Sequence, residues 1–158
     1  MDIPLIEQVK IQAQVLVPLV KALQAELGEE RANAFVRKAL GDLYRTYGET
    51  WWRAQQGADF GEKMDATFEW FAESDALDYD VINRAPDAFD VNVTRCCYAE
   101  FFGKIGALEL GFLLVCGADF TMAEGFGAGV ALTRTQTIMQ GAGHCDFRYR
   151  LRTSDQRA

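Results

Sequence analysis

The sequence has little positive charge. Sixteen Lys and Arg stand against 23 Asp and Glu, which gives a net charge of -7 at pH 7, and no basic run occurs outside the C-terminal tail. Binding to a nucleic-acid backbone requires clustered Lys and Arg. We therefore expect no nucleic-acid partner.

The N-terminus lacks the charged region and the small-residue cleavage site of a signal peptide. The longest uncharged stretch near it, residues 11–20, contains two glutamines and is too short to cross a bilayer. These absences predict a cytoplasmic protein with no membrane partner.

Cysteine and histidine are present, but not at metal-binding spacing. The chain has four cysteines and one histidine, and it has no Cys-x-x-Cys pair. Cytoplasmic thiols stay reduced, so we expect core residues, metal ligands or reactive groups rather than disulfides. The spacing favours no metal and no cofactor. The alternative is a Cys₃His zinc site, for which the candidate ligands are Cys96, Cys116, Cys145 and His144.

Length and composition favour one globular domain. The 158 residues are 49% apolar and 25% charged, which is ordinary for a folded domain and excludes a disordered chain. No internal repeat, low-complexity run or linker interrupts them. We expect a single domain over residues 1–158, with a helical part at 1–75 and a sheet-containing part at 76–151.

Apolar residues in the first half recur at the spacing of three and four residues that is typical of helices. A first helix is predicted from residue 3 to 27, ended by Gly28, with Pro18 kinking or dividing it. A second begins at Glu29, and Gly48 is expected to interrupt it. A third is predicted at about residues 60–73.

The period changes to two after Ser74. Residues 77–95 alternate around a turn at 84–87, which predicts an antiparallel hairpin. Helices are then expected at 98–105 and 107–122, and strands at 130–138 and 145–151. The prediction is an α+β fold: a helical N-terminal half followed by ββ-αα-ββ, with a four-stranded antiparallel sheet covered by helices on one face.

Three cysteines lie at element ends or strand centres. Cys96 precedes a predicted helix, whose dipole should lower its thiol pKa with help from the charge of Arg95. Cys116 lies three residues before Asp119, so the two share a helical face. Cys145 is predicted on the inner face of the last strand. The alternative for each thiol is a small buried hydrophobic residue.

His144 and Asp146 fall on the strand face opposite Cys145, because strand residues alternate between faces. A catalytic relay of these three consecutive residues is therefore awkward. His144 either acts with a partner on another element or is a surface histidine near the turn at residues 141–143.

Arg134 lies in an unusually polar run, residues 133–137. An arginine there could hold a substrate carboxylate bidentately, or the run could simply face solvent. The glycine-rich stretch at 125–129 has no preceding strand, following helix or Lys-Ser/Thr pair, so it does not predict a phosphate-binding loop.

Several segments together resemble a known family. In order they are Arg95-Cys96-Cys97-Tyr98-Ala99-Glu100, residues 109–119, Arg134-Thr135-Gln136-Thr137 and residues 141–149. Over about residues 65–151 this series resembles the L-2-amino-thiazoline-4-carboxylic acid hydrolase family. More distantly, Gly141-x-x-x-Cys145-x-Phe147 is similar to the 4-vinyl reductase type of ligand-binding domain. That resemblance implies a helix-covered sheet with a pocket between the layers.

The family resemblance implies hydrolytic opening of a small carboxylated heterocycle, by a thiolate or by water that a base activates. The candidates for catalysis are Cys116, Cys145, His144 and Asp119. The candidates for substrate binding are Arg134, Arg95, Cys96 and Glu100. The partner is then a small molecule with a carboxylate.

Two other functions remain open. One is a non-catalytic domain of the same fold that binds a small molecule or a metal. The other is an interaction module, in which the N-terminal helices form the surface of a homodimer or higher homo-oligomer.

Overall fold

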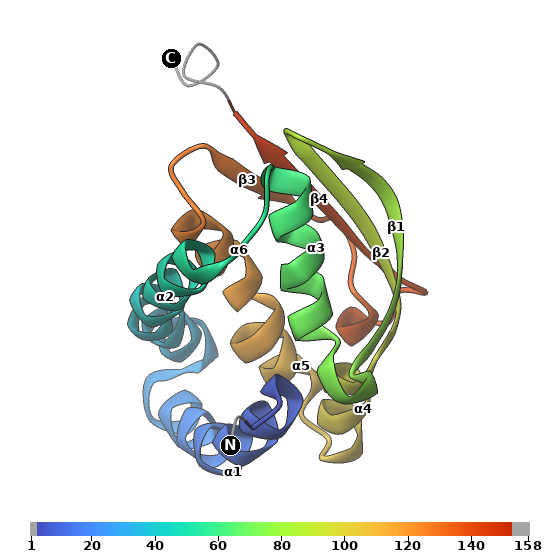
Figure 1. Cartoon of the computed structure of the whole chain (residues 1–158). Helices are drawn as coiled ribbons and strands as arrows, with labels where there is room; N and C mark the ends of the chain where they lie inside the picture. Colours follow the sequence, from blue (N-terminus) through green and yellow to red (C-terminus); the bar gives the residue numbers. More distant parts are fainter. Residues whose placement is uncertain (1–2, 153–158) are drawn as a thin grey trace.

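The computed structural model describes residues 3–152 (Figure 1). The first three helices are α1 (Leu5–Leu27), α2 (Glu29–Ala54) and α3 (Phe60–Phe71). α1 ends at Gly28, whose φ of 82° suits glycine, and it continues through Pro18 without being divided. Asp59 caps the N-terminus of α3, where its side chain accepts a hydrogen bond from the backbone N–H of Glu62.

Gly48 does not interrupt α2, so that prediction was wrong. It lies where α2 crosses α6 (Ala118–Gly125), and a Cβ at Gly48 would stand 2.2 Å from the backbone oxygen of Met122. A Cβ at Gly125 would likewise stand 2.2 Å from the backbone oxygen of Arg45. The two glycines let the backbones of α2 and α6 touch. Gly48 therefore serves this contact and lies within a continuous α2.

Replacing Gly48 with alanine should lower the free energy of unfolding by about 1–3 kcal/mol, because the added methyl would push α2 and α6 apart. Gly41, on the same helix, is the matched control: its Cβ would meet Thr121 at 3.5 Å, an ordinary contact. Gly41→Ala should leave stability unchanged or raise it by up to about 1 kcal/mol through helix propensity. Urea denaturation of both variants tests this, and equal effects would contradict it.

The sheet has the strand order β1-β2-β4-β3, with every neighbouring pair antiparallel. Its strands are β1 (Leu77–Ala85), β2 (Ala88–Cys96), β3 (Val130–Thr133) and β4 (Cys145–Leu151). The hairpin predicted over residues 77–95 is confirmed. The strand predicted over 130–138 is too long, because β3 ends at Thr133. Beyond it, the Asp146 carboxylate accepts the backbone N–H groups that a strand would use for pairing.

The helix predicted over residues 107–122 is broken into three parts. α4 (Cys97–Lys104) precedes it, and then follow α5 (Leu108–Gly111), a π-helical turn (Phe112–Cys116) and α6. In the π turn the N–H of Gly117 reaches back to the carbonyl of Phe112, at 2.8 Å. Such turns leave nearby carbonyls available to other donors and are frequent at functional sites. Here the carbonyls of Leu114 and Cys116 accept from Tyr44 and Arg134.

The helices cover one face of the sheet, as predicted, and the fold is α+β (Figure 1). The strand residues that face the helices are buried, among them Phe89, Val91 and Tyr149. Two apolar clusters form the core. One joins α1 to α4, α5 and the π turn, and the other joins α3 and α6 to the sheet.

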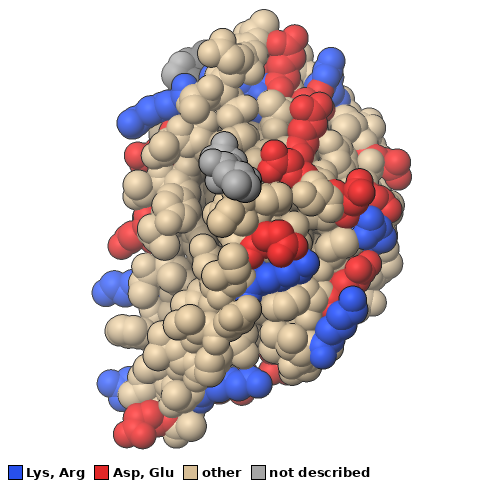
Figure 2. All heavy atoms as spheres, turned by 60° about the horizontal axis from the view of Figure 1, so that its bottom comes forward, with Lys and Arg blue, Asp and Glu red and all other residues tan. Residues whose placement is uncertain are grey.

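On the face shown in Figure 2, acidic and basic side chains are interspersed among uncharged residues. Within residues 3–152, no helix is both long and apolar enough to cross a membrane.

Candidate functional site

A cavity of about 600 Å³ lies between the two apolar clusters. α1, α2 and α3 supply half of the residues that line it, including Val9, Trp51 and Trp70. Residues of both clusters face it, Phe102 from one and Phe68 from the other. A cavity of this size and lining is typical of a small-molecule site.

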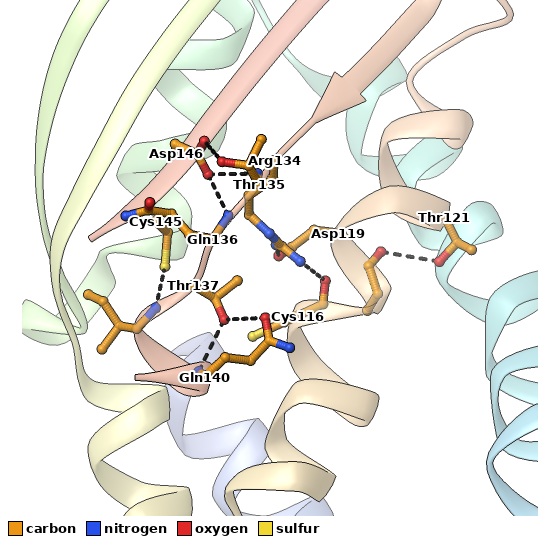
Figure 3. A network of polar contacts seen from close by, with 12 residues as sticks. Cys116, Asp119, Thr121, Arg134, Thr135, Gln136, Thr137, Gln140, Cys145 and Asp146 are labelled. Atoms are coloured by element: carbon orange, nitrogen blue, oxygen red, sulfur yellow. Dashed lines mark hydrogen bonds and ion pairs between the residues drawn. The ribbon is translucent and has the colours of Figure 1, made fainter. Parts of the chain in front are cut away.

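Five of the predicted site residues line this cavity. They are Cys96, Cys116, Asp119, Arg134 and Cys145. They come from the end of β2, the end of the π turn, the first turn of α6, the segment after β3 and the start of β4. Figure 3 labels four of them, Cys116, Asp119, Arg134 and Cys145. Residues far apart in sequence therefore form the polar end of the cavity.

Asp119 and Arg134 form a buried ion pair. Nη1 of Arg134 donates to Oδ2 of Asp119 at 2.6 Å, and Nη2 donates to the carbonyl of Cys116 at 3.0 Å (Figure 3). The Arg134 side chain is only 2% exposed, and its guanidinium lies between the rings of Phe120 and Phe147, at 4.9 and 5.1 Å from their centroids. These contacts hold the arginine in one orientation.

Burial raises the pKa of Asp119 to about 6, although Arg134 works in the opposite direction. The side chain is 22% exposed and lines the cavity. A carboxyl with this pKa exchanges its proton near neutral pH, which is what an acid–base catalyst requires.

Asp146 holds the segment that carries Arg134. Its carboxylate accepts the backbone N–H groups of Thr135 at 2.8 Å and Gln136 at 2.9 Å, and also the Thr135 hydroxyl (Figure 3). Burial acts to raise the pKa of Asp146, but these hydrogen bonds outweigh it and lower the pKa. Strand alternation placed Asp146 only on the outer strand face and did not predict this positioning role. The polar run at 133–137 was the available signal.

Cys96 does not have the lowered pKa predicted for it. Burial raises its pKa to about 11, and the hydrogen bond from the backbone N–H of Ala99 to Sγ, at 3.4 Å, offsets only part of this effect. The guanidinium of Arg95 binds Asp78 and Cys97 instead. The prediction was wrong because desolvation exceeds the effect of the helix N-terminus.

The other two thiols of the cavity are also buried. Burial raises the pKa of Cys116 and of Cys145, and Arg134 lowers each only in part. Sγ of Cys145 accepts the backbone N–H of Ile138 at 3.2 Å (Figure 3). Neither thiol is therefore largely ionised at neutral pH.

Three predicted site residues do not line the cavity. His144, just before β4, contacts the side chain of Gln136. Arg95 is held by Asp78, and Glu100 is exposed. Because His144 lies apart from the cysteines, the four candidate zinc ligands are not brought together. Among residues 3–152, no group of three or more His, Cys, Asp or Glu side chains could hold a metal ion.

Helical periodicity did not predict the aromatic wall, in which Trp70 and Phe71 of α3 line the cavity with Trp51 of α2. Helical periodicity identifies an inward-facing side chain but does not distinguish a packed core from a cavity wall. The high aromatic content of residues 51–71 was the only signal.

A helix-covered antiparallel sheet with a largely apolar cavity and a few converging polar groups is the architecture of a domain that binds small molecules. The amino-acid sequence assigns this domain to a particular family. Residues 8–149 match the family model of L-2-amino-thiazoline-4-carboxylic acid hydrolase, and the chain belongs to this family. The match begins in α1, so it includes the helical half as well as the motifs.

A search of the curated proteins gave no match. Among solved structures, the chain is similar to the crystal structure of the phenol-responsive sensory domain of the transcription activator PoxR with phenol. The TM-score is 0.54 at 12% sequence identity, and the alignment covers 89% of this chain and 76% of that one. At this identity the likeness shows a shared fold.

Proposed function

We propose that this protein is a hydrolase that opens a small heterocycle bearing a carboxylate, of the 2-amino-thiazoline-carboxylate type. The observation that carries the proposal is the buried Asp119–Arg134 pair at the polar end of the cavity, in a chain that belongs to the hydrolase family.

The ion pair matches the charges of such a substrate. Two of the five N–H donors of Arg134 are used by Asp119 and the Cys116 carbonyl, which leaves donors for a substrate carboxylate. A 2-amino-thiazoline ring has a basic amidine-type group that is cationic when protonated. That cation and the substrate carboxylate would neutralise Asp119 and Arg134, respectively.

Asp119 would act first as a base. Its carboxylate takes a proton from water while the water oxygen bonds to the ring carbon between nitrogen and sulfur. The carbon–sulfur bond then breaks, and the departing sulfur takes that proton from Asp119. The added oxygen releases its remaining proton to solvent and becomes the carbonyl of the ring-opened product. The ring nitrogen keeps the proton that made the substrate cationic, so relative to the neutral ring the net change is the addition of one water molecule.

Activated water is preferred here over attack by Cys116 or Cys145, because the raised pKa values of these thiols leave little thiolate near neutral pH. Asp119, with a pKa of about 6, is largely ionised under the same conditions. The two thiols would then pack against the reacting ring without reacting themselves.

Purified protein should open the ring of at least one compound in a panel of thiazoline, hydantoin and dihydropyrimidine carboxylates. Ring opening is measured by the release of thiol or by mass spectrometry. Cys116→Ser and Cys145→Ser should each keep activity within a few-fold of the unmodified protein. A loss of a thousandfold in either folded variant would favour the thiolate route. Absence of turnover across the panel would contradict the proposal.

The second candidate function is binding without catalysis. It is favoured by the mainly apolar lining of the cavity and by the likeness to a sensory domain whose structure was solved with phenol. Calorimetry with phenol and with the carboxylate panel distinguishes the two. Binding of phenol with no ring opened would favour this second function.

A further inference from the structure

The cavity is much larger than its polar end requires. Its volume of about 600 Å³ equals roughly twenty water molecules at the ~30 Å³ that each occupies in the liquid. A single five-membered ring with a carboxylate would occupy only the part near Asp119 and Arg134. Half of the residues that line the cavity lie on α1, α2 and α3, and none of these is charged.

This remaining part has a rigid aromatic wall. The rings of Trp51 and Trp70 stack with centroids 4.0 Å apart and an interplanar angle of 19°. Nε1 of Trp51 donates to the hydroxyl of buried Thr67 at 3.1 Å, which holds the indole in place. Val9 and Leu16 of α1 face the same space. Apolar surface held open in this way favours an apolar ligand group.

The cavity also extends to the surface. Its wall includes exposed residues of α1 and α2, among them Gln12, Thr46 and Tyr47, the last 49% exposed. The Arg134 side chain at the other end is 2% exposed. The cavity therefore extends from the buried ion pair to exposed residues of α1 and α2.

We infer that the ligand of this cavity carries a bulky aryl or alkyl substituent, which lies against α1, α2 and α3 while the carboxylate and the reacting group occupy the end at Asp119 and Arg134. The inference rests on the proposed function for the polar head of the ligand, which is the carboxylate and the reacting group. It adds the apolar body, which is the bulky substituent.

Ring-opened product analogues test it, because they are not turned over. N-carbamoyl derivatives of glycine, alanine, leucine and phenylalanine share the polar head and differ in side chain. Calorimetry should show affinity rising along the series by about fourfold per buried methylene, and N-carbamoyl-phenylalanine should bind at least about tenfold tighter than N-carbamoylglycine. Equal or falling affinity along the series overturns the inference.

A pair of variants on one helix locates the apolar body. Val9→Trp, which fills the cavity beside the aromatic wall, should weaken N-carbamoyl-phenylalanine about tenfold and change N-carbamoylglycine less than about twofold. Val15→Trp, at a position of α1 that is 67% exposed, is the control and should change neither. Ala54→Trp, at an exposed position of the same wall, replaces Val9→Trp if that variant does not fold. An equal loss for both ligands contradicts the placement.

The two proposals fail in different ways. If affinity rises along the series but no ring is opened in the carboxylate panel, the inference stands and the hydrolase proposal falls. If an unsubstituted thiazoline carboxylate is opened and larger groups bind no better, the hydrolase proposal stands and the inference falls. If no member of the series binds, the inference falls, and the carboxylate panel alone decides the hydrolase proposal.

Discussion

Replacing Asp119 with asparagine is expected to slow ring opening by about 100- to 10,000-fold, the usual contribution of a general acid–base group. Asparagine has nearly the same shape, and its side-chain oxygen can still accept the hydrogen bond that Asp119 Oδ2 takes from Arg134. It cannot take a proton from water. The loss should therefore appear chiefly in kcat, and the missing charge opposite the substrate cation should weaken binding to a smaller extent.

The pH profile checks the same role. Burial raises the pKa of Asp119 to about 6, and the base is its ionised form, so kcat/KM should rise with pH through about 6 and then level off. This rise should vanish in Asp119→Asn. Asp42→Asn, at an exposed carboxylate of α2 whose side chain is 82% exposed, is the control and should keep the normal profile. A profile that is flat from pH 5 to 7 in the unmodified protein would contradict the role of Asp119.

Replacing Arg134 with methionine is expected to lower the free energy of unfolding by about 3–5 kcal/mol at pH 7, because removal of one partner leaves a buried charge uncompensated. Arg134 is 2% exposed and pairs with Asp119 at 2.6 Å. Arg45, an exposed arginine that pairs with Asp42 and Glu124, gives the control. Arg45→Met should cost no more than about 1 kcal/mol.

The penalty should depend on pH in a defined direction. Without Arg134, nothing offsets burial, so the pKa of Asp119 should rise above its present value of about 6. A carboxyl whose pKa is raised by folding destabilises the folded state progressively above its unfolded pKa. The penalty of Arg134→Met should therefore be smaller at pH 5 than at pH 7, as measured by urea denaturation at both.

A double replacement tests whether the uncompensated charge of Asp119 causes the loss of stability. Arg134→Met combined with Asp119→Leu removes both partners, and substitution of a whole buried pair by apolar residues is often neutral. The double variant should be more stable than Arg134→Met alone. If it is less stable, the uncompensated charge is not the cause of the loss.

Periodicity predicted most of the fold because each element buries one face. Its failures have separate causes. Gly48 was read as a helix break, but it serves the contact of α2 with the backbone of Met122. The strand expected to reach residue 138 ends at Thr133. The backbone N–H groups of Thr135 and Gln136 donate instead to the carboxylate of Asp146, eleven residues after Thr135. Local patterns do not contain such contacts.

The same distinction applies to the site. Residue type and the order of the motifs identified Cys96, Cys116, Asp119, Arg134 and Cys145 as candidates, and these line the cavity. The same reasoning also named His144, Arg95 and Glu100. A chemically capable side chain is recognisable in sequence, but the direction in which it points depends on the elements packed around it.

By itself, the sequence determined the fold class and the family, and it included the five residues of the polar end among its candidates, because hydrophobic period and ordered motifs are properties of the chain. Only the tertiary structure decided which charges meet, and it thereby decided the protonation of the site. Asp119 and the thiols are ordinary ionisable groups in sequence. Burial beside Arg134, on elements that are distant in the chain, raises the pKa of Asp119 to about 6 and raises the pKa of each thiol of the cavity.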